Sequence, residues 1–144
     1  MSETAATKAS EAALPRVIPR SSAPGVLRGA LLGFGQVAED AHAPAFERSP
    51  DFSIVAVAEP APKRLAAARA RFPRARAYPS PEALLESESG LDFVDIAAPP
   101  FLHAELALRA LRRRLHVLCE KPLALRAGEF ESLRAEAARQ KKAL

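Results

Sequence analysis

The chain has 144 residues, of which 49% are hydrophobic, so it can form one domain with a real core and is not disordered throughout. Its formal charge of +4 is spread along the chain, and no apolar run is long enough to cross a bilayer, which argues against membrane association. A single cysteine, Cys119, excludes an internal disulfide framework and favours a cytoplasmic location; with three scattered histidines it forms no metal-ligand cluster.

The first 25 residues differ in composition from the rest of the chain, because they are rich in Ala, Ser, Thr and Pro. Pro15, Pro19 and Pro24 interrupt regular structure, and no continuous apolar stretch of the signal-peptide kind is present. We expect a disordered leader over residues 1–25, or a start codon assigned too far upstream, and a folded domain over residues 26–144.

A buried strand over residues 26–32 is predicted to run into the turn G-F-G-Q-V-A of residues 33–38 and then into a helix. Gly33 permits a tight turn, Gly35 lets the backbone approach a pyrophosphate, and Ala38 lets the helix pack near the strand. The helix dipole favours phosphate at this end. The residues expected to contact a dinucleotide here are Gly33, Phe34, Gly35, Gln36 and Val37.

The second strand is predicted over residues 52–58, and it ends in the acidic residue Glu59. A carboxylate at this place accepts hydrogen bonds from the adenosine ribose and repels a 2′-phosphate. We therefore expect NAD as the cofactor, with NADP possible because Lys63 and Arg64 follow closely enough to weaken the preference.

The rest of the chain alternates between the two kinds of regular structure, with proline as the commonest breaker. The expected elements are a helix over 36–42, a kinked or restarted turn over 43–48 at Pro44, a helix over 62–72, a weak strand over 75–78, a helix capped by Ser80 with Leu84 and Leu85 buried, a strand over 91–98, a helix over 102–113 with Leu108 and Leu111 inward, a strand over 116–119, and a helix over 127–142 with Phe130, Leu133 and Ala137 on its buried face.

This alternation predicts an α/β fold with a doubly wound parallel sheet, in which ligands bind outside the carboxyl ends of the strands. Four predicted strand ends carry candidate residues and should meet at one edge. The only basic triplet, residues 112–114, is read as a solvated helix end; a nucleic-acid site there would lack interleaved aromatic residues.

Four segments together resemble one known family: G-F-G-Q-V-A at 33–38, V-A-E-P at 57–60, I-A-A-P-P-F-L-H at 96–103 and H-V-L-C-E-K-P at 116–122. They look like the N-terminal domain of the glucose-fructose oxidoreductase, inositol dehydrogenase and rhizopine-catabolism family. The resemblance covers residue 27 to the C-terminus and implies an NAD(P)-dependent oxidoreductase acting on sugars, cyclitols or related polyols.

The resemblance implies that Lys121 is a catalytic residue near the nicotinamide ribose and the substrate hydroxyl, with Glu120 beside it. A cation there can orient a hydroxyl and stabilise developing negative charge, whereas the alternative is a solvated surface lysine. The resemblance also implies that Ala98, Pro99 and His103 border the cofactor; an ordinary polar residue early in a helix is the alternative for His103.

The sequence departs from the family in two ways. Ala98 stands where Thr is usual, and Arg114 stands where Gly commonly ends the helix. The resemblance also implies a second domain with a catalytic histidine, which we expect to lie outside these 144 residues. His42 and His116 are assigned to structure. Two readings stay open: an oxidoreductase completed by a substrate domain, or a truncated and catalytically inert nucleotide-binding domain. An uncovered sheet edge and apolar surface would also favour self-association.

Overall fold

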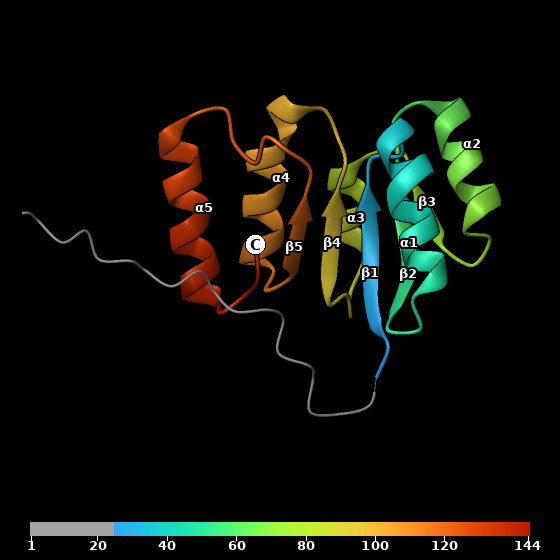
Figure 1. The fold of residues 1–144 in the computed structure, drawn as a ribbon, viewed down its shortest axis with the longest axis horizontal. Helices are drawn as coiled ribbons and strands as arrows, with labels where there is room; N and C mark the ends of the chain where they lie inside the picture. Colours follow the sequence, from blue (N-terminus) through green and yellow to red (C-terminus); the bar gives the residue numbers. More distant parts are fainter. Residues whose placement is uncertain (1–24) are drawn as a thin grey trace, which may run out of the picture.

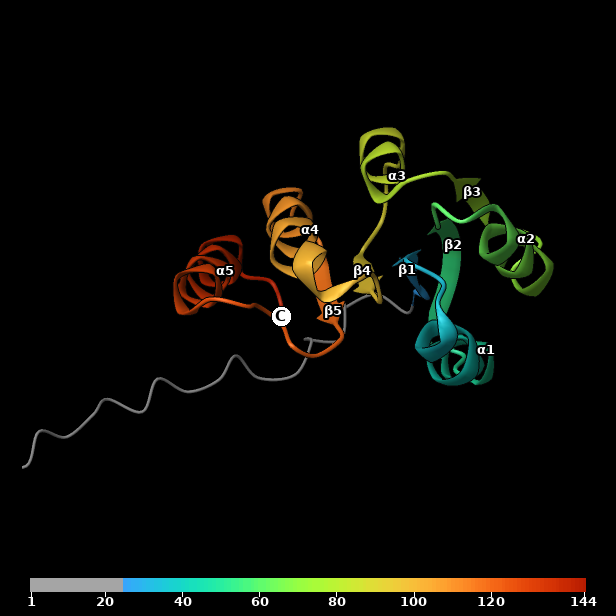
Figure 2. The ribbon, with the colours of Figure 1, turned by 90° about the horizontal axis from the view of Figure 1, so that it is seen from above.

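The computed structural model describes residues 25–144, which form a five-stranded sheet with helices on both faces (Figures 1 and 2). The leader expected over residues 1–25 lies outside the described residues except for Gly25. The strands are β1 (Leu27–Leu32), β2 (Phe52–Ala58), β3 (Arg76–Tyr78), β4 (Phe93–Ile96) and β5 (His116–Cys119). The helices are η1 (Ala38–His42), α1 (Ala43–Arg48), α2 (Pro62–Arg71), α3 (Pro81–Ser87), α4 (Pro100–Arg112) and α5 (Ala127–Gln140).

The strand order is β3-β2-β1-β4-β5, and every neighbouring pair is parallel, which confirms the predicted doubly wound fold. The order reverses between β1 and β4, the place where such sheets bind ligands. The carboxyl ends of these strands lie level with one another. Leu32 pairs with Ala58 and Ile96, and Ile96 pairs with Cys119. The segments that follow β1, β2, β4 and β5 therefore leave the sheet at one edge, as expected.

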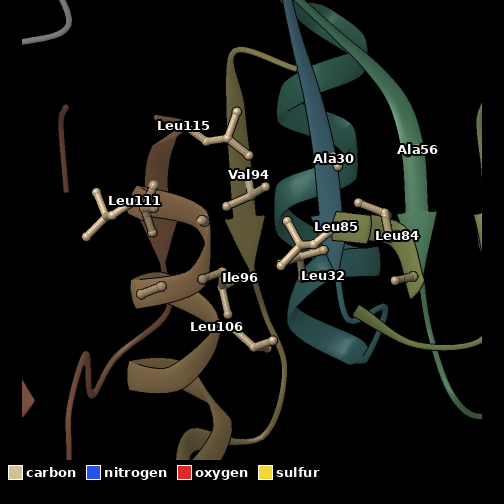
Figure 3. Close-up of a cluster of buried hydrophobic side chains, with 14 of the residues drawn as sticks. Ala30, Leu32, Ala56, Leu84, Leu85, Val94, Ile96, Leu106, Leu111 and Leu115 are labelled. Carbon is tan, nitrogen blue, oxygen red and sulfur yellow. The ribbon is translucent and has the colours of Figure 1, made fainter. Parts of the chain in front are cut away.

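Two apolar cores lie on the two faces of the sheet because successive side chains of a strand point to opposite sides. Ala30 and Leu32 face α3, α4 and α5, where they join the larger core drawn in Figure 3. Leu31, between them, faces the smaller core formed with η1, α1 and α2. Strands buried on both faces need near-continuous apolar runs, which explains why β1 and β2 were recognisable in the sequence.

The first helix continues from Gln36 to Arg48 through Pro44, because its middle adopts a π turn. The Ala43 N–H donates to the Ala38 carbonyl five residues back, and Pro44, which has no N–H, occupies the first turn of α1. The interruption predicted at Pro44 therefore takes the form of a π turn rather than a separate helix.

The predicted Ser80 cap is confirmed, and the structure gives the backbone conformation at Arg114, where Gly is usual in the family. The Ser80 hydroxyl accepts a hydrogen bond from the Ala83 N–H at 3.1 Å and so caps α3. Arg114 has φ 62°, the left-handed conformation for which Gly is usual, and this costs about 1 kcal/mol relative to Gly.

One core prediction is wrong. Phe130 is 46% exposed, whereas Leu133 and Ala137 of the same helix are buried as expected. The reason is the position of α5 at the end of its layer, where it packs beside α4 and only a narrow stripe of the helix is covered (Figure 2). Leu108 is half-buried and packs against the larger core.

An apolar hollow of about 520 Å³ lies on the α1 side of the sheet beside β5. Phe46, Phe93 and the half-exposed Leu118 line it. The edge of β5 is not wholly open, since the Val117 N–H donates to the Ala143 carbonyl at 2.9 Å. Self-association through this face stays a prediction, which light scattering would measure. Between residues 25 and 144, no helix is long and apolar enough to cross a membrane.

Candidate functional site

The two glycines of the turn after β1 have different structural roles. Gly33 has φ +99°, and a Cβ added to it would lie 2.6 Å from the Ala97 carbonyl oxygen. Its N–H donates to the Ala58 carbonyl, so the turn is held against the ends of β2 and β4. A Cβ added to Gly35 would meet no atom within 4 Å. Gly33 is therefore needed by the fold itself, while Gly35 leaves an open backbone surface.

The helix that follows begins at this open surface. Its first hydrogen bond runs from the Glu39 N–H to the Gly35 carbonyl at 3.0 Å, so the preceding amides point ahead of the helix. Gln36 and Val37 are exposed there, whereas Ala38 is buried against the smaller core. Free amides and the positive end of the helix dipole are features that favour an anion at a helix N-terminus.

Glu59, at the end of β2, braces the glycine turn. Its Oε2 accepts the Phe34 N–H at 2.8 Å, and its Oε1 accepts the Ala61 N–H at 2.8 Å and the Arg64 guanidinium at 3.0 Å. Burial by itself raises the pKa of Glu59, but these hydrogen bonds and the Arg64 charge outweigh it and hold the pKa below its ordinary value. The residue is therefore a buried carboxylate tied to the turn.

This bracing role was not foreseen from the sequence. Each carboxylate oxygen accepts two hydrogen bonds, so Oε2 keeps one acceptor position besides the Phe34 amide. The Arg64 side chain is 57% exposed and covers the other oxygen from the solvent side.

The loop after β4 is joined to the loop after β5 by His103. This residue of α4 is 1% exposed, with Nε2 2.7 Å from the Ala98 carbonyl oxygen and Nδ1 2.8 Å from the Pro122 carbonyl oxygen. Because a carbonyl oxygen only accepts, both contacts are hydrogen bonds when both ring nitrogens carry protons. Pro99 lies exposed at the edge, and Ala98 is half-buried. His103 therefore lies behind the edge and holds its two loops together.

The segment after β5 carries Glu120 and Lys121 to the same edge. The Glu120 N–H donates to the Ile96 carbonyl at 2.9 Å, which extends the pairing of β4 and β5 by one residue. Lys121 is exposed, and the peptide bond between Lys121 and Pro122 is cis. The Lys121 side chain is thus open to solvent at the edge where the predicted site residues meet.

A side-chain bridge connects this segment to the sheet. His42, from η1, lies with Nδ1 2.7 Å from Asp95 Oδ2 and Nε2 2.8 Å from Glu120 Oε1. Asp95 is a fully buried carboxylate in the middle of β4. From the sequence, His42 was expected to have only a structural role, and Asp95 was not expected to belong to the site. The sequence signal that could have identified Asp95 is an acidic residue inside an otherwise apolar strand.

Burial and charge oppose each other in this bridge. Burial lowers the pKa of His42, but Asp95 and Glu120 outweigh it, so the pKa of the imidazole lies above its ordinary value. Burial raises the pKa of Asp95, and the His42 charge only partly offsets this. Among the described residues, Asp95 Oδ1 has no hydrogen-bond partner. A protonated imidazole in this position would donate to both carboxylates and offset their mutual repulsion.

The fold and this edge define a dinucleotide-binding Rossmann domain, with a glycine turn, a helix N-terminus and an acidic residue in the expected places. Residues 27–144 match the oxidoreductase family with an NAD-binding Rossmann fold, Gfo/Idh/MocA. The chain belongs to this family and forms its NAD(P)-binding domain.

Relatives and solved structures agree with this assignment. D-glucoside 3-dehydrogenase of Escherichia coli is 34% identical over 99 residues, which are 69% of this chain and 28% of that protein. The WlbA dehydrogenase of Chromobacterium violaceum, solved with NADH and UDP-GlcNAcA, superposes with TM-score 0.78 at 29% identity, over 88% of this chain and 36% of that one.

A 3-ketoreductase of Actinomadura kijaniata, solved in an open conformation with NADP and TDP-benzene, has TM-score 0.76 at 32% identity, over 83% of this chain and 37% of that one. The chain spans about three tenths of the length of the curated relatives it matches. Both forms of the cofactor, NADH and NADP, are thus bound by proteins of similar structure.

Proposed function

We propose that the carboxyl edge of the sheet binds NAD(H) or NADP(H) with the pyrophosphate over Gly35, the adenosine ribose toward Glu59, and the nicotinamide toward Pro99 and Lys121. The observation that carries the proposal is the open backbone surface at Gly35, directly ahead of the first helix amides. A Cβ added at this position would meet no atom within 4 Å, so there is open space beside the Gly35 backbone.

Within a complete enzyme, we propose hydride transfer to or from a sugar, a cyclitol or a related hydroxyl compound. NAD(P), when bound, supplies the hydride acceptor or donor. Lys121 would orient the substrate hydroxyl and stabilise negative charge on its oxygen, because it is a solvent-open cation at the edge. The names of the relatives, which include sugar dehydrogenases and a sugar-nucleotide reductase, support this substrate class.

The second candidate is a nucleotide-binding domain without turnover of its own. Gly35 and Glu59, which support binding, both lie within the described residues. Steady-state assays with a panel of sugars and cyclitols, using both cofactors, separate the two candidates. Turnover by this chain alone would exclude the inert domain.

Calorimetry with NAD, NADP and ADP-ribose tests the binding itself. We expect all three to bind, since they share the adenosine diphosphate that the glycine turn would hold. We also propose that NAD binds more tightly than NADP, because Glu59 remains ionised and disfavours a 2′-phosphate. Equal or tighter NADP binding would refute this preference, and failure of all three ligands would refute the site.

A further inference from the structure

Three ionisable side chains from three separate elements meet behind the segment that carries Lys121. His42 comes from the π turn η1, Asp95 from the middle of β4, and Glu120 from the residue after β5. The two hydrogen-bond distances, 2.7 Å and 2.8 Å, place the imidazole directly between the carboxylates. The exposed fractions of the side chains rise from 0% for Asp95 through 16% for His42 to 30% for Glu120. The bridge therefore runs from the core to the surface of the site.

The chemistry of the three groups makes His42 the necessary link. Two ionised carboxylates only accept hydrogen bonds and repel each other, so neither can hold the other directly. An imidazolium donates from both ring nitrogens and cancels one negative charge. Buried Asp95 is fixed by the sheet, because β4 pairs with a strand on each side. Glu120 is thus anchored to the rigid part of the molecule through one histidine.

The local backbone supports a specific placement of this histidine. The π turn inserts one extra residue into the helix between Gln36 and Arg48, and His42 is its last residue. A residue inserted into a helix changes the direction of the side chains around it, and such turns often occur at functional sites. Pro44 favours the turn, because it cannot donate the usual helical hydrogen bond.

We propose that His42 is a positioning residue for the Glu120–Lys121 segment: by tying Glu120 to Asp95, it holds Lys121 at the nicotinamide end of the cofactor site. This inference rests on the proposed function, because that function places the nicotinamide near Lys121. His103 supports the same segment from the other side, through the Pro122 carbonyl. The segment is therefore held on two sides by histidines that do not themselves contact the open edge.

The test compares NADH with ADP, which lacks both the nicotinamide and the ribose attached to it. For His42→Phe, we expect NADH affinity to fall about tenfold, the loss of roughly one charged hydrogen bond, while ADP affinity stays within about twofold. Retained ADP binding also shows that the variant is folded. Equal losses for both ligands, or no loss for either, would overturn the positioning role.

Paired variants separate positioning from general packing. Asp95→Asn keeps an oxygen that accepts from the imidazole and should preserve NADH affinity, whereas Asp95→Leu should reproduce the loss seen for His42→Phe. His116→Phe is the matched control, because His116 is a half-buried histidine at the opposite end of β5. A selective NADH loss in the control would contradict the proposal, as would identical behaviour of the Asn and Leu variants.

Nuclear magnetic resonance gives a readout that does not depend on the cofactor. In the parent, we expect both ring nitrogens of His42 to carry protons, and the Lys121 amide signal to move in His42→Phe but not in His116→Phe. Failure of the parent to bind either ligand would refute the proposed function alone. Unchanged Lys121 signals in His42→Phe would refute this inference alone.

Discussion

The glycine turn after β1 and the Glu120–Lys121 segment after β5 lie at the same edge of the sheet but are held in different ways. The turn is held by its own backbone, by close contact with Ala97, and by one carboxylate, Glu59. The segment after β5 is held chiefly by side chains, His42 on one side and His103 on the other.

Because the two regions are held differently, different kinds of substitution should disrupt them. Where two backbone segments pack closely, a single added methyl group can overlap the neighbouring segment and destabilise the fold. A side-chain bridge fails when a donor or an acceptor is removed, and then the loop is misplaced while the sheet survives. The turn should therefore respond to substitution in stability, and the segment after β5 should respond in ligand selectivity.

The largest expected effect is on the turn. Gly33→Ala should lower the free energy of unfolding by about 3 kcal/mol, because the new Cβ would overlap the Ala97 carbonyl at a left-handed backbone position. Urea unfolding measures this change, with Gly35→Ala as the control expected to cost less than about 1 kcal/mol. Similar stability for the two variants would show that the close contact does not hold the turn.

The second effect separates binding from folding within the same turn. Gly35→Val should weaken NAD binding by at least about a hundredfold, because a branched side chain would occupy the pyrophosphate position, and it should leave the fold largely intact. Gly128→Val is the matched control, since Gly128, at the start of α5, also has open space around its Cα. Normal NAD binding by Gly35→Val, measured by calorimetry, would contradict the phosphate role.

The third effect distinguishes the two regions by the sign of their pH dependence. The folded-state pKa of His42 is raised, so its stabilisation is present below pH 6.5 and is lost as pH rises through that raised pKa. The pKa of Glu59 is lowered, so its stabilisation is present above pH 4.5 and is lost as pH falls through that lowered pKa.

Urea unfolding across pH measures both contributions against matched variants. The stability gap between the parent and His42→Phe should shrink from pH 6 toward pH 9, and the gap between the parent and Glu59→Gln should shrink below pH 4.5. Asp95 and Glu120 face His42, and the nearby thiol Cys119 has its pKa raised to about 12 by burial and these carboxylates, so it stays protonated throughout. A stability gap that widens toward pH 9 for His42→Phe, or below pH 4.5 for Glu59→Gln, would contradict the pKa directions given for these two residues.

The smallest effect concerns cofactor choice beside the turn. Arg64→Ala should weaken NADP binding about fivefold more than NAD binding, because the exposed guanidinium is the cation closest to Glu59 and can meet a 2′-phosphate. Arg69→Ala, on the same helix but farther along it, serves as the control. An unchanged ratio of the two affinities would remove Arg64 from cofactor selection.

The order of elements, the parallel sheet and the glycine turn could all be predicted from the amino-acid sequence. These features depend on interactions within a few residues: apolar runs for buried strands, Ser80 for a helix cap, and glycine for a left-handed backbone at position 33. The shared edge then followed, because the carboxyl ends of parallel strands lie at the same edge of a sheet.

The contacts that hold the site together became visible only in the folded molecule. The bridge joins His42 to Asp95 and to Glu120, which lie 53 and 78 positions away along the chain, and no local pattern marks such a pairing. Its existence depends on the π turn, on the order of β1, β4 and β5, and on burial of a carboxylate within an apolar strand. The bracing by Glu59 and the burial of His103 have the same origin, because hydrogen-bond partners are chosen by packing rather than by spacing in the sequence.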